Sequence, residues 1–215
     1  YMTRAPAHRR RPEARPEEIL EAALAVFGEQ GFAAARVEDI ARRAGLSKGT
    51  LYLYFPSKEA MLNALIEQSA GALARVVEQH VATSAAADPE AALRGLLRIL
   101  FTAVSSPKVS AAPRLVLTEA HRFPELAAFY RSHVLDIVRR AMRALLDAAV
   151  AKGVFRPVDA DAFMRVIAGP GIAHMALTNI FDLHPDKLTD PAELADAIAD
   201  ILLNGLKPRL ESEPS

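Results

Sequence analysis

A tight connection between two short helical patterns, at residues 37–58, constrains the fold of this chain more than any other feature. Its sequence is VEDIARRAGLSKGTLYLYFPSK. Apolar residues with the i, i+3, i+4, i+7 spacing of one helical face are Val37, Ile40, Ala41 and Ala44. Gly45 follows where a helix C-terminus favours positive φ, and Ser47 stands where its hydroxyl can cap the next helix. The spacing predicts two helices joined by a short turn.

The second of these helices, residues 48–54, places Leu51 inward and polar or aromatic side chains outward. A glycine within a helix costs about 1 kcal/mol relative to alanine, and close approach to another surface is one reason to keep Gly49 there. Tyrosine hydroxyls can hydrogen-bond phosphate oxygens. The pattern indicates a helix-turn-helix that inserts its second helix into a DNA major groove. The candidate DNA-binding residues are Arg36, Ser47, Lys48, Gly49, Thr50, Tyr52, Tyr54 and Lys58.

The segment IARRAGLSKGTLYLYFPSKEAML resembles the DNA-binding signature of the TetR family of bacterial transcriptional regulators. The resemblance covers about residues 16–65. The matching positions are Ile40, Ala41, Ala44, Gly45, Ser47, Gly49, Leu51, Tyr52, Phe55 and Lys58. The chain departs from the family at Tyr54, where His is frequent, and at Arg36, where Thr or Ser is frequent. Tyr54 can still reach a phosphate, whereas Arg36 cannot cap the first helix as a hydroxyl would.

Helical periodicity runs through nearly the whole chain, and no alternating β-branched stretch occurs. The 215 residues are 51% hydrophobic, lack Trp, and suffice for one large or two small domains. We therefore expect an all-α protein with an N-terminal three-helix helix-turn-helix domain and a C-terminal helical domain. The expected parts are a basic flexible arm at 1–15, the DNA-binding domain at 16–58, an effector-binding and dimerisation domain at 59–206, and a tail at 207–215. A long helix expected from residue 58 to about 82 links the two domains, either coupling their functions or serving as a plain structural connector, and a second long helix is expected at residues 125–152.

The charge distribution is slightly asymmetric. The net charge is zero, but residues 1–58 carry 10 Lys and Arg against 7 Asp and Glu. Five arginines fall within the arm, which either follows the DNA backbone or a minor groove, or is an inert solvated tail. The excess of positive charge therefore lies in residues 1–58, the part of the chain that would face the DNA phosphates.

Several other classes of function lack the residues they need. Without cysteine the chain has no disulfides or thiolate metal sites. No histidine pair has the zinc-binding i, i+4 spacing with an intervening Glu, and neither a G-x-S-x-G elbow nor a P-loop is present. We expect no catalytic residue, no metal and no cofactor. The longest apolar run, residues 166–177, is too short to cross a bilayer, so we expect a cytoplasmic protein without a membrane partner.

The resemblance implies that the C-terminal domain holds an effector, and its composition favours a small apolar or amphipathic molecule. The candidate pocket residues are Phe101, Leu117, His121, Phe129, Met164, His174, Met175 and Phe181. Apolar residues of this kind are more often ordinary core than ligand contacts, and a histidine on an apolar helix, such as His174, is more often a satisfied core residue than a ligand contact.

Dimerisation follows from the proposed DNA contact, because one short recognition helix discriminates poorly while a two-fold pair contacts two half-sites. Pro170, between two glycines, is expected to kink or unwind its helix. The candidate interface residues, which the resemblance places in a four-helix bundle with their mates, are Gly169, Gly171, Ile198, Ile201 and Leu202.

These observations together predict a homodimeric repressor that occupies a palindromic operator of double-stranded DNA and is released by a small-molecule effector. The long helix after residue 58 would connect the two events. Two alternatives from other classes stay open: a helical module that binds a partner protein, and an enzyme. A steep salt dependence of binding would favour DNA, and a bound metal or turnover would indicate an enzyme.

Overall fold

The computed structural model describes residues 15–179 and 190–207, and these residues contain no β-strand. The all-α prediction is confirmed. The predicted arm lies outside the described residues except for Arg15, and so does most of the predicted tail. In chain order the helices are α1 (Arg15–Gln30), α2 (Val37–Arg43), α3 (Lys48–Tyr52), α4 (Lys58–Ile66), α5 (Ala72–Ser84), α6 (Pro89–Val104), α7 (Pro107–Glu119), α8 (Pro124–Tyr130), α9 (Asp136–Ala151), α10 (Ala160–Asn179) and α11 (Pro191–Leu206).

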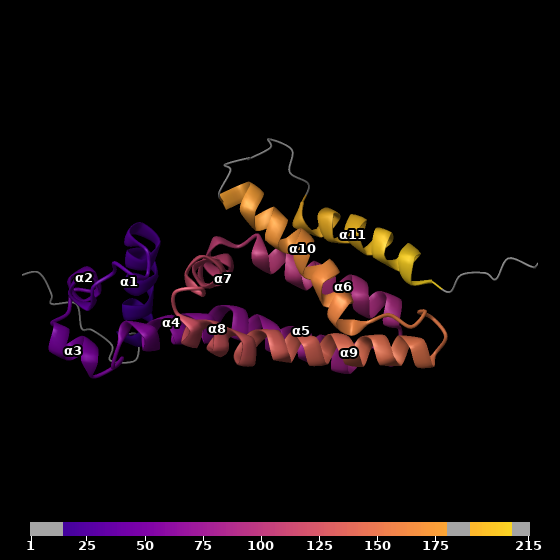
Figure 1. Cartoon of the computed structure of the whole chain (residues 1–215), viewed down its shortest axis with the longest axis horizontal. Helices are drawn as coiled ribbons and strands as arrows, with labels where there is room; N and C mark the ends of the chain where they lie inside the picture. Colours follow the sequence, from indigo (N-terminus) through magenta and orange to yellow (C-terminus); the bar gives the residue numbers. More distant parts are fainter. Residues whose placement is uncertain (1–14, 180–189, 208–215) are drawn as a thin grey trace, which may run out of the picture.

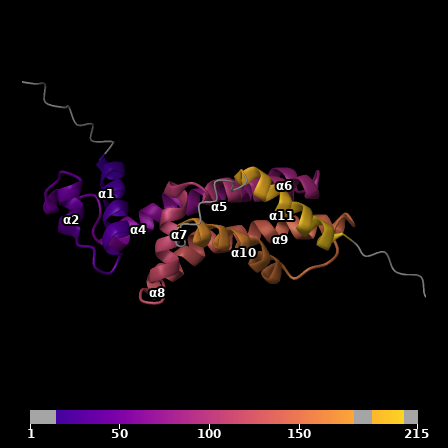
Figure 2. The ribbon, with the colours of Figure 1, turned by 90° about the horizontal axis from the view of Figure 1, so that it is seen from above.

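The molecule is elongated, with a small helical domain at one end (Figure 1). Helices α1, α2 and α3 form this end, and α4 leads from it into the larger group of helices. Within that group, α5 and α9 lie side by side along the long axis, and α6 packs against α11. The view turned by 90° shows the same separation of the two ends (Figure 2).

Two short π-helical turns interrupt the long helical paths that the sequence predicts. Glu67–Gly71 joins α4 to α5, and Arg131–Leu135 joins α8 to α9. The expected helix from residue 58 to about 82 and the expected helix from 125 to 152 are therefore each helical throughout, but not α-helical throughout. The two π-turns contact each other, so the departures from α-geometry lie together in space. Wide turns of this kind are frequent at functional sites.

The apolar side chains form two separate cores. The first surrounds Phe27, Ile40 and Leu51 in the small domain, and it also takes in Leu115 of α7 and Leu126 of α8. The second is built by α5, α6, α9, α10 and α11. Helices α7 and α8, which lie beyond residue 59 in the sequence, therefore pack with the small domain.

Helix α10 stays helical through Pro170, so the local unwinding expected there does not occur. Its neighbour α11 is fixed to α6 by ion pairs. Arg98 donates two hydrogen bonds of 2.7 Å to the carboxylate of Asp196, and Arg94 donates one of 2.6 Å to Asp200. These contacts leave another face of α11 exposed, on which the side chain of Ile201 is 73% exposed.

Candidate nucleic-acid interface and central cavity

The turn between α2 and α3 has the geometry that the sequence predicts. Gly45 adopts φ +66°, its amide donates to the carbonyl of Arg42, and the Leu46 amide donates to the carbonyl of Ala41 at 2.9 Å. This pair of bonds is a Schellman motif, which needs a left-handed residue and so favours glycine. Ser47 Oγ then accepts a hydrogen bond of 3.1 Å from the amide of Thr50 and caps α3. We call α2, this turn and α3 the recognition unit.

The outer surface of α3 carries the predicted polar and aromatic side chains. Lys48, Gly49, Tyr52 and Tyr54 are exposed, while Leu51 is fully buried beneath them. Among the described residues, a Cβ on Gly49 would meet only Ser47 Oγ, at 3.9 Å, so none of them requires glycine here. Close approach of an external surface is consistent with that freedom.

Ser47, Thr50 and Arg36 take different places around α3. Ser47 and Thr50 share a hydrogen bond of 2.8 Å between their hydroxyls, and Thr50 is half-buried. Arg36 is the N-cap of α2, is exposed, and makes no side-chain cap hydrogen bond, as its residue type predicts. The Arg36 side chain therefore does not stabilise the start of α2.

Leu53 is a residue that the sequence interpretation passed over. Its side chain is 84% exposed, more than any other large apolar side chain in the described part of the chain. It follows α3 directly and stands between Tyr52 and Tyr54. An apolar side chain so exposed beside two half-exposed tyrosines indicates a surface that a partner covers. The sequence signal for it was the apolar residue between two outward tyrosines.

Acidic side chains hold the cations of the recognition unit. Lys48 pairs with Glu38 and lies 5.7 Å from the centroid of the Tyr52 ring. The hydrogen bond to Glu38 raises the pKa of Lys48, and the same bond lowers the pKa of Glu38. Arg43 donates to Glu29 at 2.7 Å. A DNA phosphate at this surface could replace the carboxylates as the partner of Lys48 and Arg43, because breaking these exposed ion pairs costs little free energy.

The Lys58 side chain turns inward. Its Nζ donates to the carbonyls of Phe32, Ala33 and Ala35 at 2.8, 3.0 and 3.3 Å. It also lies 4.8 Å from the centroid of the Phe32 ring. A DNA phosphate at Lys58 would have to compete with three carbonyl acceptors. In this structure Lys58 connects α4 to the loop before α2.

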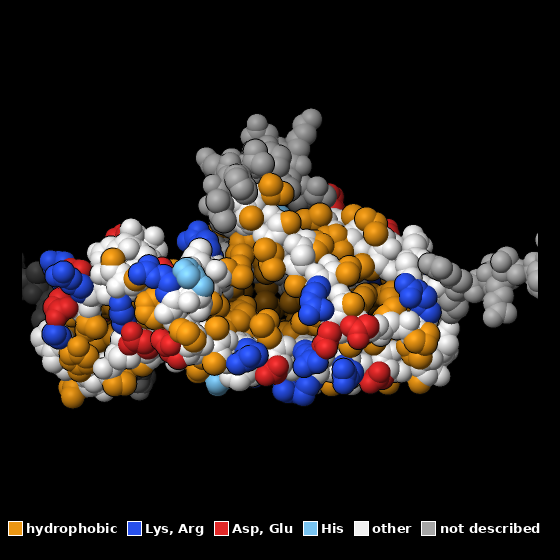
Figure 3. Space-filling model, in the orientation of Figure 1, with side chains coloured by type: hydrophobic (Ala, Val, Ile, Leu, Met, Phe, Trp, Pro, Cys, Tyr) orange, Lys and Arg blue, Asp and Glu red, His pale blue; other side chains and the backbone are white. Residues whose placement is uncertain are grey.

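A cavity of about 550 Å³ occupies the middle of the larger domain. It opens on the face seen in Figure 3 as a hollow bordered by apolar side chains. Helices α5, α6, α7, α8, α9 and α10 all contribute to its lining. We call it the central cavity, and its size suits a drug-sized ligand.

The predicted pocket residues divide between this cavity and other places. Phe101, Leu117, Met164 and Met175 line the cavity. Phe181 lies outside the described residues. The three that the structure places elsewhere are His121, which is exposed beyond the end of α7, Phe129, which stacks on the His133 ring with centroids 3.9 Å apart, and His174, whose Nε2 lies 3.1 Å from Ser105 Oγ.

The residues predicted for a dimer interface are also divided. Gly169 and Ile201 are exposed, and Ile198 and Leu202 are half-buried. Gly171 is half-buried and lines the central cavity, as does the more exposed Ile172 beside it. Other exposed apolar side chains on α10 are Val166, Ile172 and Leu177.

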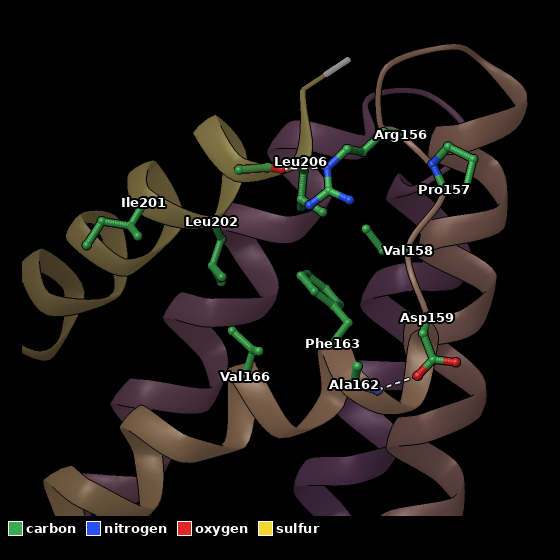
Figure 4. A pocket seen from close by; sticks show the side chains of 11 residues that line it. Arg156, Pro157, Val158, Asp159, Ala162, Phe163, Val166, Ile201, Leu202 and Leu206 are labelled. Atoms are coloured by element: carbon green, nitrogen blue, oxygen red, sulfur yellow. Dashed lines mark hydrogen bonds between the residues drawn. The ribbon is translucent and has the colours of Figure 1, made fainter. Parts of the chain in front are cut away.

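A second hollow of about 440 Å³ lies between the start of α10 and the end of α11. Phe163, Val166 and Leu202 converge on it in Figure 4. Arg156 closes one end, where its amide donates to the Leu206 carbonyl at 2.8 Å and its Nε donates to the Gly205 carbonyl at 2.9 Å. The hollow therefore continues the exposed apolar surface of these two helices.

The described residues include no cluster of three His, Asp or Glu side chains placed to hold a metal ion. Among the same residues, no helix has the length and apolarity needed to cross a membrane.

Known proteins resemble the chain along most of its length. Residues 19–65 match the family described as bacterial regulatory proteins, tetR family, and residues 85–202 match the tetracyclin repressor-like C-terminal domain. The HTH-type transcriptional repressor KstR2 of Mycolicibacterium smegmatis is 32% identical over 158 residues, which cover 73% of this chain and 75% of the relative.

Solved structures share the same fold. The ketosteroid transcriptional regulator KstR2 of Mycobacterium tuberculosis superposes with a TM-score of 0.68 at 26% identity, over 93% of this chain and 98% of the other. The regulator FadR of Bacillus subtilis in complex with stearoyl-CoA gives a TM-score of 0.67 at 20% identity, over 88% and 98%. At that identity the second likeness concerns the fold alone.

Proposed function

The chain belongs to the TetR family of bacterial transcriptional regulators, and from that premise we propose that it is a repressor released from a palindromic operator by a small-molecule effector. The observation that carries this proposal is one helical path. From Lys58 to Ser84 it starts against the small domain and then passes the central cavity, where Ala70, Leu73 and Ala74 form part of the lining. An effector in the cavity would touch the same path that supports the recognition unit.

Operator binding would use the exposed surface of α3. The absence of a side chain at Gly49 would let the helix approach the groove closely, and Lys48 and Thr50 would contact base edges. The hydroxyls of Tyr52 and Tyr54 would donate to phosphates on either side. DNA of a bacterial cell lies in the cytoplasm, which is where this activity would occur.

A homodimer would present two recognition units to two half-sites one helical turn, or a multiple of one, apart. The exposed apolar surface of α10 and α11 is the candidate interface, with Val166, Ile172 and Ile201 each about half exposed or more. Covering such side chains with a second copy removes apolar surface from water. The ion pairs between α6 and α11 would hold α11 in position for this contact.

Coupling between cavity and recognition unit would also pass through α7. Val116 of this helix lies in the core of the small domain and lines the cavity as well. At the end of the helix, the Glu119 carboxylate lies beside Gly31, and its Oε2 is buried without a hydrogen-bond partner among the described residues. An unsatisfied buried acceptor destabilises this arrangement, so a second arrangement of the α1–α7 junction can compete with it.

Selection of bound fragments from a random DNA library, at two salt concentrations, tests the DNA half of the proposal. We expect a palindromic consensus whose affinity falls steeply with salt. Lys48→Ala should change the preferred bases, whereas Lys152→Ala, at the far end of α9, should change neither preference nor affinity. Absence of any enriched sequence would instead favour a helical module that binds a partner protein.

Operator affinity in the presence of cavity ligands tests the other half. The matched variant is Ala127→Phe, which puts a large side chain into the cavity lining. We expect a ligand that weakens operator binding of the wild type to have no effect on this variant. A ligand that binds the wild type without changing its operator affinity contradicts effector release.

A further inference from the structure

The polar groups of the central cavity are few. Of the described residues that line it, only Ser110 and Tyr130 carry a hydroxyl, and none carries a charge. The rest of the lining consists of aliphatic, aromatic and methionine side chains, together with Pro113 and Gly171. A ligand inside therefore meets an apolar wall with two polar points.

Tyr130 offers an uncommitted donor. Burial raises the pKa of its phenol to about 12, so the hydroxyl keeps its proton at any physiological pH. Tyr130 is half-buried at the cavity wall, and no hydrogen bond joins its hydroxyl to the described residues. A ligand that fills the cavity would take water away from this hydroxyl, and an acceptor on the ligand would replace the lost hydrogen bond.

Ser110 differs from Tyr130, because its proton is already used. Its Oγ donates a hydrogen bond of 3.0 Å to the carbonyl of Ser106 in the preceding turn of α7. Only its lone pairs remain for a ligand. The donor that the cavity presents is therefore the phenol of Tyr130.

The absence of charge in the described lining restricts the ligand further. A carboxylate or ammonium placed within this wall would lose its hydration without gaining an ionic partner, which is strongly unfavourable. A carbonyl oxygen loses less hydration and recovers a hydrogen bond. We infer that the central cavity binds an uncharged, mainly apolar molecule whose carbonyl oxygen accepts a hydrogen bond from Tyr130. This inference names the ligand class of the cavity and rests on the proposed effector function.

Three probes of matched size separate the contributions of shape, acceptor and charge: 4-phenyl-2-butanone, butylbenzene and 4-phenylbutanoate. Their affinities for the full chain are measured by calorimetry, in the wild type and in Tyr130→Phe. The matched control is Ser132→Ala, which removes a hydroxyl from the neighbouring exposed turn and is not in the cavity lining. Ala127→Phe, which fills the cavity, shows whether binding occurs there.

We expect the ketone to bind the wild type roughly fivefold or more tightly than it binds Tyr130→Phe, the factor expected from one neutral hydrogen bond. Butylbenzene should bind both proteins equally, 4-phenylbutanoate should bind at least about tenfold more weakly than the ketone, and Ser132→Ala should behave as the wild type. Because the Tyr130 hydroxyl has no partner to lose, Tyr130→Phe should fold normally, which circular dichroism checks.

Equal affinities for the ketone and butylbenzene, a ketone affinity that Tyr130→Phe leaves unchanged, tighter binding of the carboxylate, or no binding of any probe would each overturn the inference. Operator binding in the presence of the ketone is scored separately. If the ketone binds through Tyr130 but leaves operator affinity unchanged, the ligand class stands and effector release fails.

Discussion

The recognition unit depends on contacts between residues close together in the sequence, whereas the central cavity depends on residues far apart in it. In the recognition unit the decisive contacts are local: the Leu46 amide bonds to Ala41, and Ser47 bonds to Thr50. The cavity brings together residues as far apart as Ala70 and Met175, from six helices. A short sequence therefore suffices to build the first, while the second exists only when most of the chain has packed.

The two regions nevertheless share structure. Helix α7 places Leu115 and Val116 in the core of the small domain, while Val116 and Leu117 line the cavity. The two regions are thus separate in their chemistry but not in their packing. Substitutions that damage one and spare the other measure how far that separation extends.

The largest effect should come from Leu51→Ala, which empties a fully buried site beneath α3. A buried leucine reduced to alanine destabilises a core by about 2–5 kcal/mol. We expect operator binding to be lost while the ketone still binds the cavity, as measured by calorimetry, because Leu51 lies in the first core and not in the cavity lining. Parallel loss of ketone binding would show that the two regions fold as one unit.

Tyr130 should give the cavity a dependence on alkaline pH. Its folded pKa of about 12 lies above the ordinary value of 10 because burial disfavours the phenolate. The folded state therefore keeps the proton to higher pH than the unfolded state, and stability falls as pH rises from 10 to 12, by roughly 2–3 kcal/mol. Denaturant titrations of the wild type and Tyr130→Phe should diverge over this range. If the wild type and Tyr130→Phe lose stability equally between pH 10 and 12, the Tyr130 phenol is exposed to solvent rather than buried.

Lys58→Met should lower the free energy of unfolding by about 2 kcal/mol, because it removes a charged donor from the carbonyls of Phe32, Ala33 and Ala35. The control is Lys48→Met, which removes the same group from an exposed ion pair and should leave stability unchanged while weakening operator binding. The reverse outcome, with Lys58 affecting DNA affinity and not stability, would return Lys58 to the DNA contact surface.

The smallest effect should come from Ser47→Ala, which removes the cap of α3 and costs about 1 kcal/mol. Ser57→Ala removes the equivalent cap of α4, where Ser57 Oγ accepts from the Ala60 amide at 3.1 Å. Both variants should unfold with similar loss of stability in thermal melts, but Ser47→Ala should weaken operator binding more. If both variants lose the same operator affinity, the N-terminus of α4 matters as much for operator binding as the N-terminus of α3.

The sequence by itself determined the helical class, the two helices and turn of the recognition unit, and the conformations of Gly45 and Ser47. These depend on contacts within a few residues, so propensity and spacing suffice. Composition also selected several residues that line the cavity, such as Phe101 and Met164, because apolar side chains on long helices tend to be covered.

Only the tertiary structure decided which covered residues face an empty space. His121 and Phe129 lie outside the cavity lining, Gly171 lies in it, and Tyr130 was not a sequence candidate. Lys58 turned inward because three carbonyls of a distant loop converge on it. The spacing of apolar residues did not predict the two π-turns. A π-turn adds one residue to a single helical turn, and the helices that pack around it decide where this occurs. Local spacing thus fixed the DNA-recognition helix, and long-range packing fixed the cavity.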